Sequence, residues 1–115
     1  MTTLLVTNDF PPTVGGIQSY LRDFVDEVVR RGGAGSIVVL ASVQNAEVVR
    51  AWDAAQPYEV IRYPRKVMLP TPALKREMVR IIKERGIDTV WFGAAAPLAV
   101  MGKAAKQAGA RRVVA

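Results

Sequence analysis

Apolar residues along the chain fall into short runs separated by loops and by segments with helical periodicity. Runs that are apolar on both faces, such as residues 36–41, are typical of strands buried in a parallel sheet. Residues 58–63 alternate apolar and polar positions, which indicates a more peripheral strand. The pattern predicts strands at residues 3–7, 36–41, 58–63, 88–92 and 111–115.

Between these strands, apolar residues recur three and four positions apart, as on one face of an amphipathic helix. The first helix is predicted to begin at Ile17 and to end at the glycine pair Gly32-Gly33; its apolar face comprises Ile17, Tyr20, Leu21, Phe24, Val25, Val28 and Val29. Further helices are predicted at residues 46–55, at 73–85 before Gly86, and from Pro97 to 108 before Gly109.

Strands that alternate with helices form right-handed βαβ units and a doubly wound parallel sheet, so we expect an α/β, Rossmann-like fold. The simplest strand order is 3-2-1-4-5. Ligands of such sheets bind at the carboxyl ends of the strands, where the order reverses. No helix follows the last predicted strand, and we therefore expect the chain to be the amino-terminal part of a longer protein.

Composition and charge limit the chemistry. The 115 residues suit one domain, and they include no cysteine and no histidine, which excludes disulfides, thiol catalysis, the usual zinc sites and a Ser-His-Asp triad within this chain. The net charge of +6 is regional: residues 1–61 carry 4 basic and 7 acidic side chains, and residues 62–115 carry 12 and 3. This excess indicates an anionic partner, either phosphate, nucleic acid or a membrane surface.

No signal peptide and no membrane span are visible, so we expect a cytoplasmic protein. Nucleic acid is disfavoured, because no aromatic residues are interleaved with the basic ones.

The glycine pair Gly15-Gly16 lies between the first predicted strand and helix. Glycines at this place let a ligand approach the backbone closely, and the free N–H groups and the helix dipole favour a phosphate or a developing anion. Gln18 can add a hydrogen bond to a hydroxyl or a phosphate. The spacing matches neither G-x-G-x-x-G nor a P-loop. The alternative is that the two glycines only make the turn.

Three segments resemble one group of enzymes. Residues 8–21, Asn-Asp-Phe-Pro-Pro-Thr-Val-Gly-Gly-Ile-Gln-Ser-Tyr-Leu, resemble the amino terminus of retaining glycosyltransferases of the GT-B fold, and more closely the GDP-mannose-dependent phosphatidylinositol mannosyltransferases. Residues 67–72 and 90–99 resemble the same enzymes.

The resemblance implies a two-domain enzyme in which residues 1–115 form the acceptor-side domain up to its fifth strand, while an absent carboxy-terminal domain holds the nucleotide sugar. It implies that Gly15 and Gly16 face the donor diphosphate and the transferred sugar, and that Gln18 helps to hold the inositol head group. In such enzymes mannose passes from GDP-mannose to a phosphatidylinositol or phosphatidylinositol mannoside acceptor with retention and without a metal or other cofactor. The family's histidine after the fifth strand has no counterpart here, so we expect no catalytic residue and no activity in this chain alone.

Asn8 and Asp9 lie on the same loop and are candidate partners for sugar hydroxyls. The alternative is that they cap the backbone of their own loop. Residues 93–96, Gly-Ala-Ala-Ala, follow the fourth strand. Their small side chains either leave space for a ligand or for the opposing domain, or they allow tight packing of the strand against a helix.

Basic residues form a stripe on the helix at 73–85 and continue onto the preceding loop, where Met68 and Leu69 are expected to be exposed. The candidate residues for docking on an anionic membrane are Arg65, Lys66, Arg76, Arg80 and Lys83. A lipid acceptor would require such a contact, which would make the protein peripheral at the inner face of the cell membrane. The alternative is a solvated helix face.

The rival to a transferase is a non-catalytic α/β domain that binds a phosphorylated ligand or an acidic partner through its basic half.

Overall fold

The computed structural model describes residues 2–12, 15–43, 45–93 and 98–114. Parts of the segments singled out above, namely residues 13–14 and 94–97 with the predicted helix start at Pro97, lie outside the described residues.

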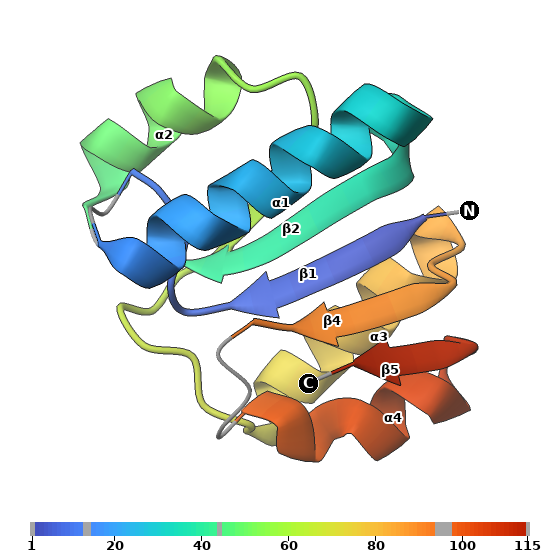
Figure 1. The fold of residues 1–115 in the computed structure, drawn as a ribbon. Coiled ribbons are helices and arrows are strands. Elements are labelled where there is room, and N and C mark those ends of the chain that lie inside the picture. Colours follow the sequence, from blue (N-terminus) through green and yellow to red (C-terminus); the bar gives the residue numbers. More distant parts are fainter. Residues whose placement is uncertain (1, 13–14, 44, 94–97, 115) are drawn as a thin grey trace.

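The strands form a single parallel sheet (Figure 1). They are β1 (Thr3–Thr7), β2 (Ile37–Ser42), β3 (Glu59–Tyr63), β4 (Thr89–Phe92) and β5 (Arg112–Val114). The order is β3-β2-β1-β4-β5, with every neighbouring pair parallel. The predicted α/β class and the strand order 3-2-1-4-5 are therefore confirmed.

Helices cover both faces of the sheet (Figure 1). Helix α1 (Gly16–Gly32) and α2 (Ala46–Ala54) lie on one face, whereas α3 (Pro72–Arg85) and α4 (Gly102–Gln107) lie on the other. This division follows from right-handed crossovers, because the chain moves outward from β1 to β3 and then returns to β4 beyond β1. The order thus reverses between β1 and β4.

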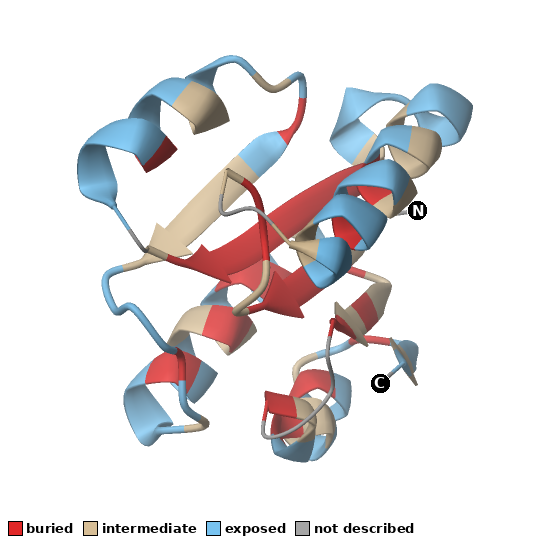
Figure 2. Cartoon of the chain, turned by 60° about the vertical axis from the view of Figure 1, so that its left-hand side comes forward, coloured by how far each residue is buried: buried red, intermediate tan, exposed pale blue. Residues whose placement is uncertain are grey.

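Alternate residues of the central strands enter two separate cores. Leu5 of β1 packs with Leu21 and Val25 of α1, whereas Leu4 and Val6 pack with α3 and α4. Figure 2 shows the result: the middle strands are buried, and the edge strand β3 is only partly covered. Burial on both faces explains the continuous apolar runs of β1 and β2.

Local signals fix the ends of two helices. The Asn45 side chain accepts hydrogen bonds from the first turn of α2, and the Thr71 hydroxyl accepts one from Leu74 at the start of α3. Gly86 ends α3 in the left-handed conformation, with a φ of 59°. The segment predicted as one last helix consists, in its described part, of a 3₁₀ turn at Leu98–Met101 followed by the shorter helix α4.

Candidate functional site

The glycine pair lies at the carboxyl ends of the strands, next to the point where the strand order reverses. Helix α1 begins at Gly16, one residue earlier than the apolar period predicts, with Gly15 preceding it. Gly93 follows the end of β4 directly, and its N–H donates to the Val6 carbonyl of β1 at 3.0 Å. In a doubly wound sheet this is the crevice in which ligands bind.

The backbone of this segment does not require glycine at either position. The φ of Gly15 is 166°, which is extended backbone that any residue adopts, and Gly16 has helical backbone without a positive φ. A Cβ on Gly16 would meet nothing within 4 Å. The backbone conformation thus gives no reason for glycine at these two positions, whereas close approach by a ligand is a reason that remains.

The first turn of α1 has backbone donors that no described side chain caps. Gly15 at the N-cap has no side chain to do so, and Gly16 is exposed. The Gln18 carboxamide folds back over Gly15 and lies where a Cβ of that residue would be. Gln18 is only partly buried. An anion at this end would meet N–H groups and the positive end of the helix dipole.

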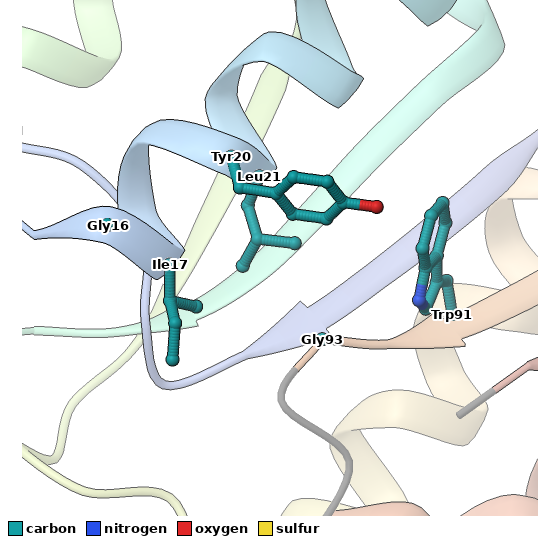
Figure 3. Close-up of a pocket in the computed structure, with 6 residues that line it drawn as sticks. All are labelled: Gly16, Ile17, Tyr20, Leu21, Trp91 and Gly93. Atoms are coloured by element: carbon teal, nitrogen blue, oxygen red, sulfur yellow. The ribbon is translucent and has the colours of Figure 1, made fainter.

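An apolar groove of about 300 Å³ opens beside the glycine pair (Figure 3). Its lining residues come from the first turns of α1 and from β4: Gly16, Ile17, Tyr20, Leu21, Trp91 and Gly93. Ile17 and Tyr20 are 50% and 62% exposed, so they line the groove rather than the core that the helical period suggests. The Trp91 ring packs edge-on against Phe24, with 3.9 Å between the ring centres.

Gly93 is explained by packing. A Cβ at this position would lie 3.1 and 3.2 Å from the two Leu21 methyl carbons and 3.2 Å from the Thr7 Cβ. The floor of the groove is therefore a close contact between β4, β1 and α1, as tight strand-to-helix packing predicts.

The Asn8 side chain joins two loops rather than pointing freely into the crevice. Its Nδ2 donates to the Met68 carbonyl at 3.0 Å, and the Met68 N–H donates to its Oδ1 at 2.6 Å. The Asp9 N–H donates to the Thr7 hydroxyl at 2.9 Å, while the Asp9 carboxylate makes no hydrogen bond with a described residue. Contact of Asn8 and Asp9 with a sugar remains a prediction. Of the two, Asp9 has the side chain whose hydrogen-bonding groups are not used by another described residue.

Arg62, near the end of β3, is a further residue at this end of the sheet that the sequence pattern did not single out. It donates hydrogen bonds to the carbonyls of Pro11 and Ser42 and to both carboxylate oxygens of Asp53. The sequence around Arg62 gives no indication of these contacts, because its partners are 9 to 51 positions away in the sequence.

The loop between β3 and α3 presents basic and apolar side chains together. Arg65 and Lys66 are exposed, and Val67 and Leu69 are 60% and 54% exposed. Met68 is fully buried, contrary to expectation, because its backbone is fixed by Asn8 and its side chain enters the core. In the part of the chain that the structure describes, no helix has both the length and the apolar composition to cross a membrane.

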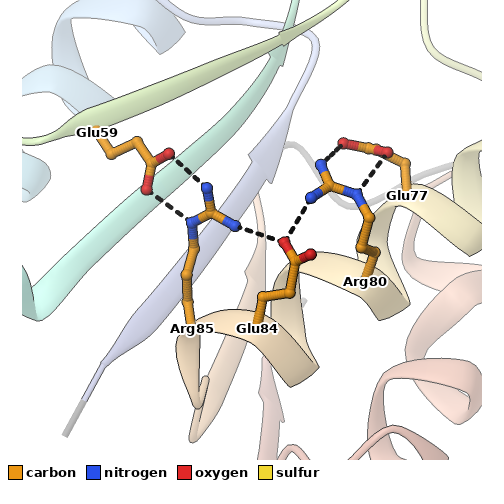
Figure 4. Close-up of polar contacts among 5 residues, drawn as sticks. All are labelled: Glu59, Glu77, Arg80, Glu84 and Arg85. Carbon is orange, nitrogen blue, oxygen red and sulfur yellow. Dashed lines mark hydrogen bonds and ion pairs between the residues drawn. The ribbon is translucent and has the colours of Figure 1, made fainter.

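The stripe on α3 is less uniformly positive than its sequence indicates (Figure 4). Arg80 pairs with Glu77 and Glu84, and Arg85 pairs with Glu84 and, through two 2.7 Å bonds, with Glu59. These hydrogen bonds lower the pKa of Glu59 and of Glu77 below the usual range. The Arg80 charge is thus balanced by carboxylates.

Arg76 and Lys83 differ from Arg80. Both are exposed, and neither pairs with a carboxylate among the described residues. They lie seven positions apart on α3, and therefore on the same face of the helix. Across residues 2–12, 15–43, 45–93 and 98–114, no group of three or more carboxylates lies together in a way that could hold a metal ion.

Comparison with known proteins identifies relatives over nearly the whole chain. A mannosyltransferase of Corynebacterium glutamicum is 62% identical over 113 residues, or 98% of this chain; its name is GDP-mannose-dependent monoacylated alpha-(1-6)-phosphatidylinositol monomannoside mannosyltransferase. The GDP-mannose-dependent alpha-(1-6)-phosphatidylinositol monomannoside mannosyltransferases of Mycolicibacterium smegmatis and Mycobacterium tuberculosis are 52% and 48% identical over 97% of this chain.

The chain spans about 29% of the length of each of these relatives. No protein-family model matches it. Over nearly its full length, the chain is thus similar in sequence to GDP-mannose-dependent mannosyltransferases of phosphatidylinositol mannosides, which confirms the resemblance drawn from its three segments.

Proposed function

We propose that this chain is the acceptor-side, Rossmann-like part of a longer glycosyltransferase that moves mannose from GDP-mannose to a phosphatidylinositol mannoside. The observation that carries the proposal is the identity of 48–62% to relatives with that named activity, across almost every residue of the chain. In this proposal a second domain, outside this chain, holds the nucleotide sugar.

The glycine pair supplies the donor side of the proposed site. Gly16 leaves the first turn of α1 open, because nothing lies within 4 Å of the place of its Cβ, so that the diphosphate and the transferred sugar can approach the N–H groups there. Negative charge develops on the leaving diphosphate during transfer, and fixed N–H donors and the helix dipole stabilise such charge without a metal. In this proposal the anomeric configuration of mannose is retained.

The acceptor side comprises Gln18 and Asp9. Both are partly exposed, and Gln18 lies against Gly15; their amide and carboxylate groups can hydrogen-bond inositol or sugar hydroxyls. Asn8 contributes chiefly by fixing the loop that carries it, through its two bonds to Met68.

Membrane docking forms the second part of the proposal. Val67 and Leu69 supply exposed apolar contact, while Arg65, Lys66, Arg76 and Lys83 supply positive charge at about 1 kcal/mol per basic residue near an anionic surface. Arg80 contributes less, because Glu77 and Glu84 offset its charge. The protein is then peripheral at the inner face of the cell membrane.

The test is transfer of labelled mannose by the longer protein that carries this chain. We expect transfer from GDP-mannose to phosphatidylinositol monomannoside in vesicles, and little transfer from UDP-glucose or to a lipid without inositol. Absence of transfer with every sugar nucleotide would overturn the proposal and favour a non-catalytic domain that binds an anionic partner.

A further inference from the structure

Arg62 ties the end of the edge strand β3 to the segment between β1 and α1. Its Nη2 donates to the Pro11 carbonyl at 2.6 Å, and its Nη1 donates to the Ser42 carbonyl at 2.9 Å. The guanidinium carbon lies 5.7 Å from the centre of the Phe10 ring. Phe10 and Pro11 lie between Asp9 and the glycine pair in the sequence, so this side chain contacts two residues that stand between the proposed acceptor and donor residues.

Asp53 of α2 fixes the orientation of this guanidinium. Its carboxylate accepts from Nε at 3.0 Å and from Nη2 at 2.9 Å, the two-point geometry that arginine forms and lysine does not. The two side chains are only 10% and 16% exposed. Arg62 is therefore held in one geometry, with its remaining donors aimed at the carbonyls of Pro11 and of Ser42, the last residue of β2.

The neighbouring contacts converge on the same segment. The Ser42 hydroxyl donates to the Asn8 carbonyl at 3.2 Å, and the Phe10 ring packs edge-on against Trp52, with 5.6 Å between the ring centres. The loop that follows β1 is thus connected to the ends of β2 and β3 through Ser42 and Arg62, on the side of the crevice opposite β4.

We propose that Arg62 is a positioning residue for mannosyl transfer: it fixes Phe10 and Pro11, which precede Gly15 and Gly16 in the sequence, without touching the substrate. This inference rests on the proposed function. Displacement of a reacting group by about 1 Å can cost about a hundredfold in rate, so a guanidinium that fixes the adjacent backbone affects kcat more than it affects binding of the lipid acceptor.

Two variants of the longer protein separate positioning from stability. Arg62→Lys keeps the charge but cannot form the two-point contact with Asp53. The double variant Arg62→Met with Asp53→Leu replaces the pair by apolar groups, which in buried sites is often neutral for stability. Arg85→Lys is the matched control, because Arg85 and Glu59 also pair β3 with a helix but lie away from the crevice.

The measurements are kcat and KM for transfer to phosphatidylinositol monomannoside, the melting temperature, and deuterium uptake by peptides covering residues 8–18. We expect kcat to fall by between about tenfold and about a hundredfold in both Arg62 variants. Deuterium uptake by these peptides should rise in both variants. The acceptor KM should change little, and Arg85→Lys should be unaffected in kcat and uptake. The double variant should lose only the stability that the Pro11 and Ser42 carbonyls gain from Arg62, and it should still unfold cooperatively well above the assay temperature.

An unchanged kcat in both Arg62 variants overturns the proposal, and so does an equal loss in Arg85→Lys. If the wild-type protein transfers no mannose at all, the proposed function fails. Deuterium uptake then decides alone: a rise confined to the Arg62 variants supports the positioning of this segment, and no rise overturns it.

Discussion

Asn8 and Met68 are joined by two hydrogen bonds, one in each direction, between the Asn8 carboxamide and the Met68 main chain. The carboxamide therefore completes the backbone bonding of a fully buried residue in the loop between β3 and α3. It also connects that loop, which carries the exposed Val67 and Leu69, to the segment that leads to the glycine pair.

Replacing Asn8 by alanine removes both bonds and leaves the Met68 N–H and carbonyl without these partners. A buried polar group without a partner costs about 1–3 kcal/mol. We expect the free energy of unfolding in urea to fall by about this amount. Gln107→Ala, at an exposed position on α4, is the control. Equal stability of Asn8→Ala and the control would show that the two bonds between Asn8 and Met68 do not stabilise the fold.

Gly93→Ala introduces a methyl group between Leu21 and Thr7, at 3.1 to 3.2 Å from their carbon atoms. Overpacking of this kind costs about 1–3 kcal/mol, and we expect this loss in urea unfolding. Gly35→Ala is the matched control, since its Cβ would meet nothing within 4 Å. A Gly93→Ala protein as stable as the control would contradict tight packing at the groove floor.

The Glu59–Arg85 pair makes stability depend on pH. Hydrogen bonding to Arg85 lowers the Glu59 pKa below its ordinary value of 4.5, so the folded state binds this proton less readily than the unfolded state. The stabilisation is present above that pH and disappears as pH falls through the folded-state pKa. We expect Glu59→Gln to be less stable than the wild type at pH 7 and to approach it below pH 4.5; a gap that stays constant with pH would be inconsistent with this pairing.

The proposed docking surface predicts that membrane binding depends more on the basic residues on and before α3 than on those on the opposite face of the sheet. We expect Arg65→Gln, Arg76→Gln and Lys83→Gln together to lower co-sedimentation with phosphatidylinositol vesicles by roughly a hundredfold, at about 1 kcal/mol for each residue. Neutralising Arg22, Arg31 and Arg50 on α1 and α2 gives the same change in net charge on the opposite face and is the control. Equal losses in both sets would indicate only long-range attraction, and no loss would exclude the proposed docking surface.

The sheet order could be predicted because the strands are buried on both faces and therefore read as apolar runs between helical periods. The candidate site could be predicted only in part. Gly15, Gly16 and Gln18 share one short motif at the start of α1, but the Met68 partner of Asn8 and the Pro11 partner of Arg62 lie 60 and 51 positions away in the sequence. Contacts of that kind leave no local pattern.

Helical periodicity also gave wrong expectations for the surroundings of some side chains. Tyr20 and Ile17 share the helical period of the core residue Leu21, yet they line an open groove, because the first turn of α1 lies at the end of the sheet. Arg80 follows the basic stripe of α3, yet the same helix supplies the two carboxylates that pair with it.

Gly16 gives the most direct test of the account. A methyl group at this exposed helical position meets nothing within 4 Å, and alanine favours a helix over glycine by about 0.5–1 kcal/mol. The measurement is mannose transfer from GDP-mannose to phosphatidylinositol monomannoside by Gly16→Ala and by the wild type of the longer protein, with the melting temperature of each. We predict equal or higher stability with transfer reduced at least tenfold, as about 1.4 kcal/mol of lost transition-state binding requires. Undiminished transfer by an equally stable Gly16→Ala protein would contradict a donor site at the glycine pair.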